Sequence, residues 1–385
     1  MIYADYNGSS PLLKPVREYL AKRIETDLFA NPNAIHSISQ KLSYGIEKCR
    51  GLIAEVVGCY PDQIIFNSGA SEGISHVFHS ILEQAEKSKD IIISSPIEHS
   101  VIPNALSYYQ KRKGFTVKYV EIDRSGRVIP ESLEKLLTEF KNKIALVTVM
   151  AVNNETGVFQ PYKEIAVLCR KYAVEFFCDT TQLIGKAEFN FETSGLDYAV
   201  CSGHKLGAVS GSGFLVAKEP TKLLPLVFGS IQEKGLRGGT QHYLGIETLA
   251  IALKDFEENQ NKLIQLENSK LKFEAEIKKA FPDVTIVGEA APRLSGTTLI
   301  GYPGIHGQAI QIELESNDIF VTTSAACTDN QPETSKVLKA MGISDPIGRG
   351  VIRISLSYTQ GEKEYSAMAQ ALKGAYTKLI KIQSF

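Results

Sequence analysis

The sequence predicts an α/β protein with two domains. Its 385 residues exceed the usual size of a single domain. Through the first 245 residues, short apolar runs alternate with helical patterns. This alternation is typical of βαβ units that build a largely parallel sheet. Beyond residue 245, a charge-rich helical pattern is followed by isolated strands, which predicts a second, smaller α+β domain.

The strands expected in the first part are short and apolar, and they lie at 63–67, 90–95, 144–149, 174–178 and 198–201. Runs such as DIIISS lack polar alternation, as expected for strands buried on both faces. Helices are expected from Ser71, from His99 and over 130–140, where Pro130 and Glu131 suit the first turn.

The second part should begin with one long helix over 247–280, because this stretch has a helical pattern without glycine. We expect this helix to connect the two domains. Strands should follow at 296–301, 319–323 and 351–357, and a closing helix at 362–382.

Charge and hydropathy argue against two classes of partner. The chain has 42 Lys+Arg and 43 Asp+Glu, a net charge of -1, so it lacks the basic footprint of a protein that binds nucleic acid directly. Its longest apolar stretch, 144–152, is too short to span a bilayer, so no membrane partner is expected. The opening residues, MIYADYNGSS, resemble no secretory signal, and we expect a cytoplasmic protein.

The sequence contains six cysteines and two closely spaced histidines that could act as chemical groups. The cysteines form no C-x-x-C pair, which disfavours a zinc knuckle or a redox dithiol. Cys327 lies in the small, polar stretch TTSAACTDNQPE, which is typical of an exposed loop; it is either a reactive thiol or a structural one. His76 and His79 have metal-binding spacing but lack a nearby third ligand, so no metal site is expected.

An acid and a lysine follow two of the expected strands. Asp179 comes directly after VEFFC, and Lys205 follows YAVCSGH. Ligands of open α/β sheets bind at the carboxyl ends of the strands. Asp179 is a metal ligand, a ribose binder, a partner for a cationic ring nitrogen or a simple helix cap; Lys205 is either solvated or a Schiff-base former. Together they match what pyridoxal phosphate requires.

Residues 67–73 (NSGASEG) lead from a strand into a helix and predict a phosphate site. Their small side chains let backbone N–H groups face an anion, and the helix dipole adds to this attraction. The stretch contains neither G-K-[ST] nor G-x-G-x-x-G, which disfavours a Walker motif and a dinucleotide fold.

With these residues, the whole chain resembles the cysteine desulfurases of the class V aminotransferase superfamily, pyridoxal-phosphate enzymes of fold type I. Ten motifs carry the resemblance in order: DYNGSSP at 5–11, ANPNAIH at 30–36, NSGASEG at 67–73, EHSV at 98–101, NNETG at 153–157, DTTQ at 179–182, SGHK at 202–205, LRGGTQ at 236–241, SAACT at 324–328 and VIRISLS at 351–357. The resemblance implies a mainly parallel seven-stranded sheet in a large cofactor-binding domain, residues 14–250, and a small domain formed by 1–13 and 251–385.

The resemblance also implies a role for each matching residue. Lys205 would form the Schiff base with pyridoxal 5'-phosphate, Asp179 would pair with the pyridinium nitrogen, and His99 would stack on the ring. Gln182 would hydrogen-bond the ring hydroxyl oxygen. The phosphate would be bound by Ala70, Ser71, Ser202 and His204, together with Thr240 of the neighbouring subunit. The substrate carboxylate would be bound by Arg353 and Asn154, and Asn154 would also contact the cofactor.

The activity implied by the resemblance converts L-cysteine to L-alanine and leaves the sulfur on Cys327 as a persulfide, for transfer to an acceptor protein. A homodimer with shared sites is expected. The acceptor is left open between an iron–sulfur scaffold, a tRNA thiolation protein and a DNA-modification pathway.

The alternatives are a selenocysteine lyase, another class V lyase or aminotransferase, and a silent scaffold that binds a partner through 247–280. Asn7, Gly8 and Thr181 depart from the usual family residues and reshape the expected substrate pocket.

Overall fold

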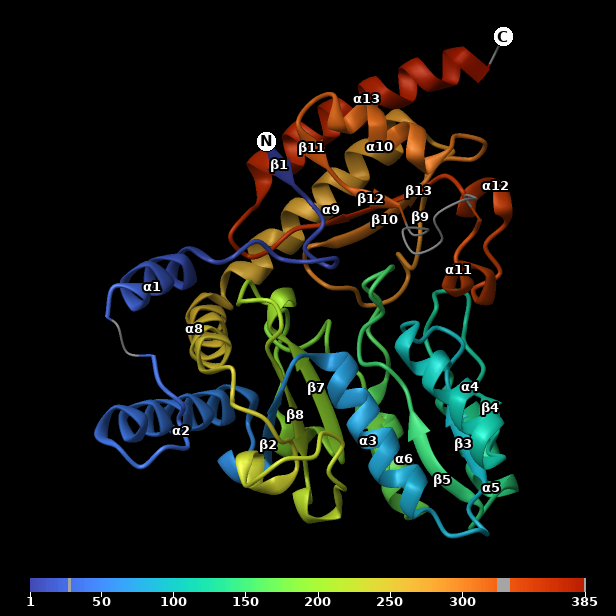
Figure 1. Cartoon of the computed structure of the whole chain (residues 1–385). Helices are drawn as coiled ribbons and strands as arrows, with labels where there is room; N and C mark the ends of the chain where they lie inside the picture. The colour runs from blue at the N-terminus through green and yellow to red at the C-terminus, as the bar shows by residue number, and fades with distance from the viewer. Residues whose placement is uncertain (27–28, 324–332, 384–385) are drawn as a thin grey trace.

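The computed structural model describes residues 1–26, 29–323 and 333–383 (Figure 1). Within them, seven strands form the central sheet in the order β2–β8–β7–β6–β5–β3–β4. These are β2 (Ile64–Asn67), β3 (Ile91–Ser94), β4 (Thr116–Tyr119), β5 (Ile144–Thr148), β6 (Phe176–Cys178), β7 (Tyr198–Ser202) and β8 (Gly213–Ala217). Pairing is parallel from β7 to β4, and β8 runs antiparallel to both its neighbours. The α/β fold and the mainly parallel sheet are confirmed.

Both faces of this sheet are buried. Ile92 and Ile93 are consecutive in β3, point to opposite faces, and belong to different apolar clusters, each with no exposed surface. One face packs on α3 (Ala70–Gln84) and α4 (Val101–Lys113). The helices of the other face are α2 (Ser37–Val57), α5 (Pro130–Glu139), α6 (Tyr162–Lys171), α7 (Phe191–Ser194) and α8 (Tyr243–Asn259).

The second part of the chain surrounds its own apolar cluster and carries two small sheets. A four-stranded sheet has the order β12–β13–β10–β9, and β1 pairs in parallel with β11. The strands are β1 (Ile2–Tyr3), β9 (Thr285–Ile286), β10 (Thr297–Gly301), β11 (Ile319–Phe320), β12 (Thr322–Thr323) and β13 (Val351–Ser355); the helices are α9 (Lys262–Ala280), α10 (Gly307–Glu315), α11 (Lys336–Ala340), α12 (Asp345–Gly348) and α13 (Glu362–Gln383).

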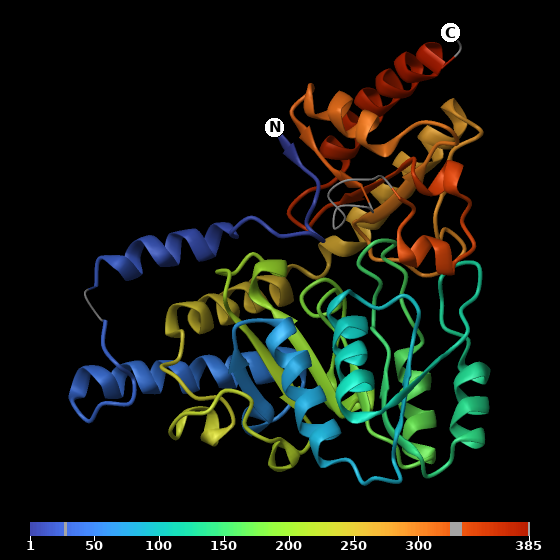
Figure 2. The same cartoon turned by 45° about the vertical axis from the view of Figure 1, so that its right-hand side comes forward.

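The β1–β11 pairing places the first residues of the chain beside its last third (Figure 1). We propose the division into 14–250 and 1–13 with 251–385 on this basis. The N-terminal segment then crosses from one part to the other and continues into α1 (Lys14–Ile24), which extends to the side together with α2 (Figure 2). Four short 3₁₀ helices complete the described elements: η1 (Pro61–Gln63), η2 (Gly203–Lys205), η3 (Pro220–Lys222) and η4 (Gln232–Gly235).

The prediction of a single helix over 247–280 is wrong, because α8 ends at Asn259 and a second helix, α9, starts at Lys262. The side-chain amide of Asn259 donates to the carbonyl of Asp255 (2.7 Å) and so competes with the backbone at the break. The expected strand at 319–323 is also divided, since β11 and β12 belong to different sheets. Within the described ranges, no helix is both long enough and apolar enough to cross a bilayer.

Candidate active site

The site is built at the carboxyl ends of β6 and β7, which are adjacent and parallel. Asp179 directly follows β6 and is only 6 % exposed. Lys205 ends the 3₁₀ turn η2 that follows β7. Because neighbouring parallel strands have their carboxyl ends at the same edge of the sheet, the fold brings the predicted acid and the predicted lysine to that edge.

Two carbonyl groups of the N-terminal segment hold the Lys205 side chain. Its Nζ donates to the carbonyl oxygens of Asn7 (2.8 Å) and Gly8 (2.5 Å). Gln182 Nε2 donates to the same carbonyl of Asn7 (2.9 Å). Asn7 therefore brings Lys205 and Gln182 together, although 175 and more residues separate it from both in sequence.

His99 lies at the turn between β3 and α4, in electrostatic contact with both Asp179 and Lys205. Desolvation by the surrounding chain lowers the pKa of His99; Asp179 opposes this shift and Lys205 adds to it. A ring poised in this way is neutral at physiological pH and is able to accept a proton.

Glu98, the residue before His99, is a buried carboxyl group beside Asp179. Burial raises its pKa to about 8, against the hydrogen bonds from Ser95 Oγ and the Met150 N–H, and the charge of Asp179 adds to the rise. Its Oε2 has no hydrogen-bond partner among the described residues. Glu98 is thus mainly protonated at neutral pH and adds no negative charge beside Asp179.

Helix α3 begins with an anion-binding arrangement. Its N-cap, Gly69, has φ 147°, and no side chain of the described residues caps the helix. The N–H of Ala70 donates to Ser202 Oγ (2.8 Å), and a Cβ at Gly69 would lie 3.0 Å from that same oxygen. The positive end of a fifteen-residue helix, whose first N–H groups have no partner within the helix, suits a phosphate.

The segment 236–241 is anchored to this helix start. Arg237 donates to both carboxylate oxygens of Glu72 (2.8 and 3.3 Å), and Glu72 accepts the N–H of Ser68 (2.9 Å). Thr240, farther along the segment, is exposed, as is Ser71 on the first turn of α3. Arg237 therefore links the segment that carries Thr240 to the predicted phosphate site.

A guanidinium group enters the site from β13. Arg353 Nη1 donates to the carbonyl of Asn154 (2.9 Å), and Nη2 pairs with Asp5 (2.6 Å). Its Nε is buried and has no partner among the residues that the structure describes. The two bonds use two of the five N–H groups of Arg353, and the others are available to an anionic ligand.

Most of the predicted site residues therefore lie near the carboxyl ends of β6 and β7. His204 Nδ1 contacts Ser9 Oγ (3.2 Å). Cys327 lies outside the described residues. His76 is buried against the carbonyl of Leu224 (2.7 Å), and the described ranges contain no group of three His, Cys, Asp or Glu side chains suited to a metal.

Several residues of this region were missed by the sequence reasoning. They are Asp5, Glu98 and Lys186, and Asn7 was noted only as a departure from the family pattern. Glu98 directly precedes His99 in a matching motif, which was a usable signal. Lys186 follows a glycine in a turn and gave none, since a lysine there is ordinarily solvated.

Comparison with known proteins agrees with this geometry. Residues 2–368 match the Aminotransferase class-V family. The chain belongs to this family. It is 32% identical over 392 residues to cysteine desulfurase 2 of Trichormus variabilis, covering 100% of this chain and 95% of the relative.

Two solved structures resemble this class-V family member over nearly their whole length. A NifS-like protein superimposes with a TM-score of 0.89 at 31% identity, covering 98% of this chain and 100% of the other. SspA in complex with cysteine gives a TM-score of 0.78 at 28% identity, covering 93% and 99%.

Proposed function

We propose that this class-V family member is a cysteine desulfurase. The observation that carries the proposal is the placement of Lys205 and the buried Asp179 after adjacent strands, in a chain similar throughout to cysteine desulfurases. Arg353 of β13 bonds the carbonyl of Asn154, the other residue expected to bind the substrate. L-Cysteine is the proposed substrate, and Cys327 is the proposed sulfur acceptor within the chain.

The residues present fit pyridoxal phosphate. A buried hydroxyl, Thr181 Oγ1, lacks a partner among the described residues next to Asp179, and Gly69 leaves room that a Cβ would fill. Lys205 would bind the cofactor covalently, with Asp179 at the ring nitrogen, His99 on the ring face and Gln182 at the ring oxygen. The phosphate would be held by Ala70, Ser71, Ser202 and His204, with Thr240 of a neighbouring subunit. When bound, this cofactor supplies an electron sink for a carbanion at the substrate α-carbon.

Residues of the chain bind the substrate, transfer the proton and accept the sulfur. Arg353 and Asn154 bind the substrate carboxylate, and Lys205 Nζ moves the α-proton. The Cys327 thiolate attacks the substrate sulfur: an S–S bond forms, the C–S bond breaks, and the substrate carbon keeps the electron pair and takes up a proton. Cysteine and the enzyme thiol thus become alanine and an enzyme persulfide, with no external oxidant or reductant.

The test is incubation of the protein with pyridoxal phosphate and L-cysteine, with alanine quantified and the persulfide mapped by mass spectrometry. The wild-type protein should release alanine and carry the extra sulfur on Cys327. Cys327→Ala should lose both while still binding the cofactor, and Lys205→Ala should lose the covalent link.

Alanine release that survives Cys327→Ala would overturn the desulfurase assignment. Faster turnover of selenocysteine by that variant would indicate a lyase instead.

We also propose a homodimer with shared sites and an unidentified sulfur-acceptor protein. Thr240 is exposed on the single chain, as are several large apolar side chains: Ile24, Phe29, Phe228 and Ile231. Helix α1 and the first part of α2 extend away from the sheet on one side (Figure 2). A dimeric mass in sedimentation, lost together with cofactor affinity in Thr240→Arg, would support a shared phosphate site.

A further inference from the structure

A second lysine lies beside Lys205. Lys186 follows Gln182 in the turn after β6, and its Nζ donates to Gln182 Oε1 (2.6 Å), Asn7 Oδ1 (2.9 Å) and the carbonyl of Tyr6 (3.3 Å). All three acceptors are uncharged. Burial lowers the pKa of Lys186 well below its usual range, Lys205 and Arg353 lower it further, and Asp5 opposes them. The three hydrogen bonds offset this desolvation.

Asn7 is the common partner of the two lysines. It is 3 % exposed, and each of its polar groups is bonded. Its carbonyl accepts from Lys205 and Gln182, and its Oδ1 accepts from Lys186. In the other direction, its Nδ2 donates to Thr297 Oγ1 (3.0 Å), a residue of β10.

The direction of these hydrogen bonds determines how Gln182 is oriented. A lysine side chain at this site acts as a donor, so the atoms that face it must be oxygens. The Gln182 amide therefore turns Oε1 toward Lys186 and Nε2 toward the carbonyl of Asn7. One N–H of Nε2 is used there, and the second remains for another acceptor.

We propose that Lys186 and Asn7 are a positioning pair that makes Gln182 a hydrogen-bond donor toward the ring oxygen of the cofactor and holds the Lys205 amine in place. This inference rests on the cofactor site of the proposed function. Without Lys186, only the bond to the Asn7 carbonyl holds the Gln182 amide, so its Nε2 is held less firmly in the orientation that faces the ring oxygen.

The test compares Lys186→Met with Lys270→Met in the full-length protein, without L-cysteine. Lys270 is a matched control: it is 1 % exposed and donates to a single carbonyl, that of Leu294 (2.7 Å), in the small domain. Three quantities are measured: the Kd for pyridoxal phosphate, the pH midpoint of the absorbance of the bound cofactor, and the melting temperature.

Lys186→Met should weaken cofactor binding by about threefold to tenfold, the usual effect of losing one hydrogen bond that orients a ligand-binding group. It should also shift the absorbance midpoint. Lys270→Met should leave both unchanged even where its melting temperature falls. Lys186→Arg, which also only donates, should restore part of the affinity.

A double-mutant cycle with Asn7→Ala tests the pair itself. Coupled residues give non-additive losses, so Asn7→Ala should cost much less affinity in the Lys186→Met background than in the wild type. Additive losses, or wild-type affinity and absorbance in Lys186→Met, would overturn the inference. A wild-type protein that binds the cofactor normally but forms no alanine would overturn only the proposed function.

Discussion

Glu98 shows how the fold sets the charge of single residues in the site. It lies beside Asp179, and its burial raises its pKa to about 8. Two ionised carboxylates at this depth would repel each other, and a protonated Glu98 avoids that cost.

The Glu98 pKa has a consequence for stability. Its value of about 8 in the folded chain exceeds its usual 4.5, so above pH 4.5 the native state holds a proton that the unfolded state has lost. Stability should therefore fall as pH rises from 5 to 8, by at most about 1.4 kcal/mol per pH unit from this group. Urea unfolding across this range should show a shallower fall in Glu98→Gln than in the wild type.

Glu139→Gln, which changes an exposed carboxyl group on α5, is the control and should keep the wild-type slope. Parallel pH profiles for the wild type and Glu98→Gln would contradict the prediction.

At this scale the sequence predicts site residues that lie at the ends of strands. It misses residues whose role depends on contacts with distant parts of the chain. Asp179 and Lys205 were placed correctly at strand ends because an apolar run marks each strand. Lys186 is half-buried, and it bonds the side chain of Asn7, 179 residues away in the sequence. No local pattern carries that contact, so the sequence left Lys186 without a role.

Among the elements, α3 depends most on one backbone conformation. Gly69 adopts φ 147°, which residues with a side chain rarely reach, and this conformation turns the chain from β2 into the helix. The glycine of NSGASEG, predicted as part of a phosphate site, thus has a conformational reason for being there. The break between α8 and α9, by contrast, depends on side-chain competition that helical periodicity does not reveal.

Gly69→Ala should destabilise the protein by about 1–3 kcal/mol because of backbone strain. It should also weaken phosphate binding at the start of α3. The matched control is Gly374→Ala in the middle of α13, where a Cβ would meet nothing within 4 Å; it should stabilise by about 0.5–1 kcal/mol. Urea unfolding measures both changes, and a neutral Gly69→Ala would show that the helix start tolerates a side chain.

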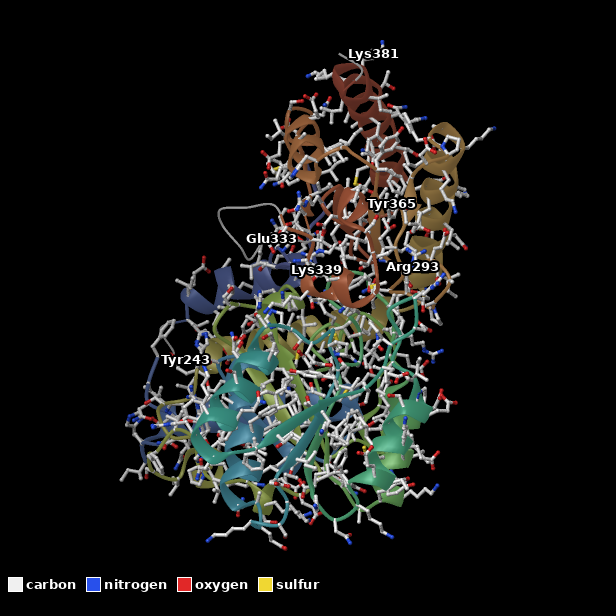
Figure 3. The ribbon with its side chains drawn as sticks, turned by 90° about the vertical axis from the view of Figure 1, so that its right-hand side faces the viewer. Tyr243, Arg293, Glu333, Lys339, Tyr365 and Lys381 are labelled. Carbon is white, nitrogen blue, oxygen red and sulfur yellow. The ribbon has the colours of Figure 1, made fainter. Side chains whose placement is uncertain are left out.

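On the scale of the whole molecule, residues 292–294 form one of the contacts between the proposed small domain and the proposed large domain. The N–H of Phe159 donates to the carbonyl of Pro292, and the N–H of Leu294 donates to that of Gly157 (both 2.9 Å). Between them, Arg293 forms a buried bidentate pair with Glu274 of α9 (2.7 and 2.8 Å). Figure 3 shows Arg293 and Lys339 at the level where the two parts meet. Arg353 bonds the carbonyl of Asn154 and so makes a further contact between the two parts.

Lys270 lies close to the Arg293–Glu274 pair. We therefore expect variants that lack Glu274 or Arg293 to differ in their free energy of unfolding. Glu274 raises the pKa of Lys270, whereas burial and Arg293 lower it, to about 8. Glu274→Met leaves two buried cations without their carboxylate and should cost about 3–5 kcal/mol. Arg293→Met should cost less, since Lys270 remains to compensate Glu274. Urea unfolding of the two variants measures the difference.

The double variant Glu274→Met/Arg293→Met should be more stable than Glu274→Met alone, because it removes the uncompensated guanidinium. Lys272→Met serves as the control: its pair with Glu362 is largely exposed, so its loss should cost at most about 1 kcal/mol. Equal losses in the two single variants would mean that Lys270 does not interact with Glu274. The larger loss in Glu274→Met would instead show that three charges at the domain junction stabilise it as one unit.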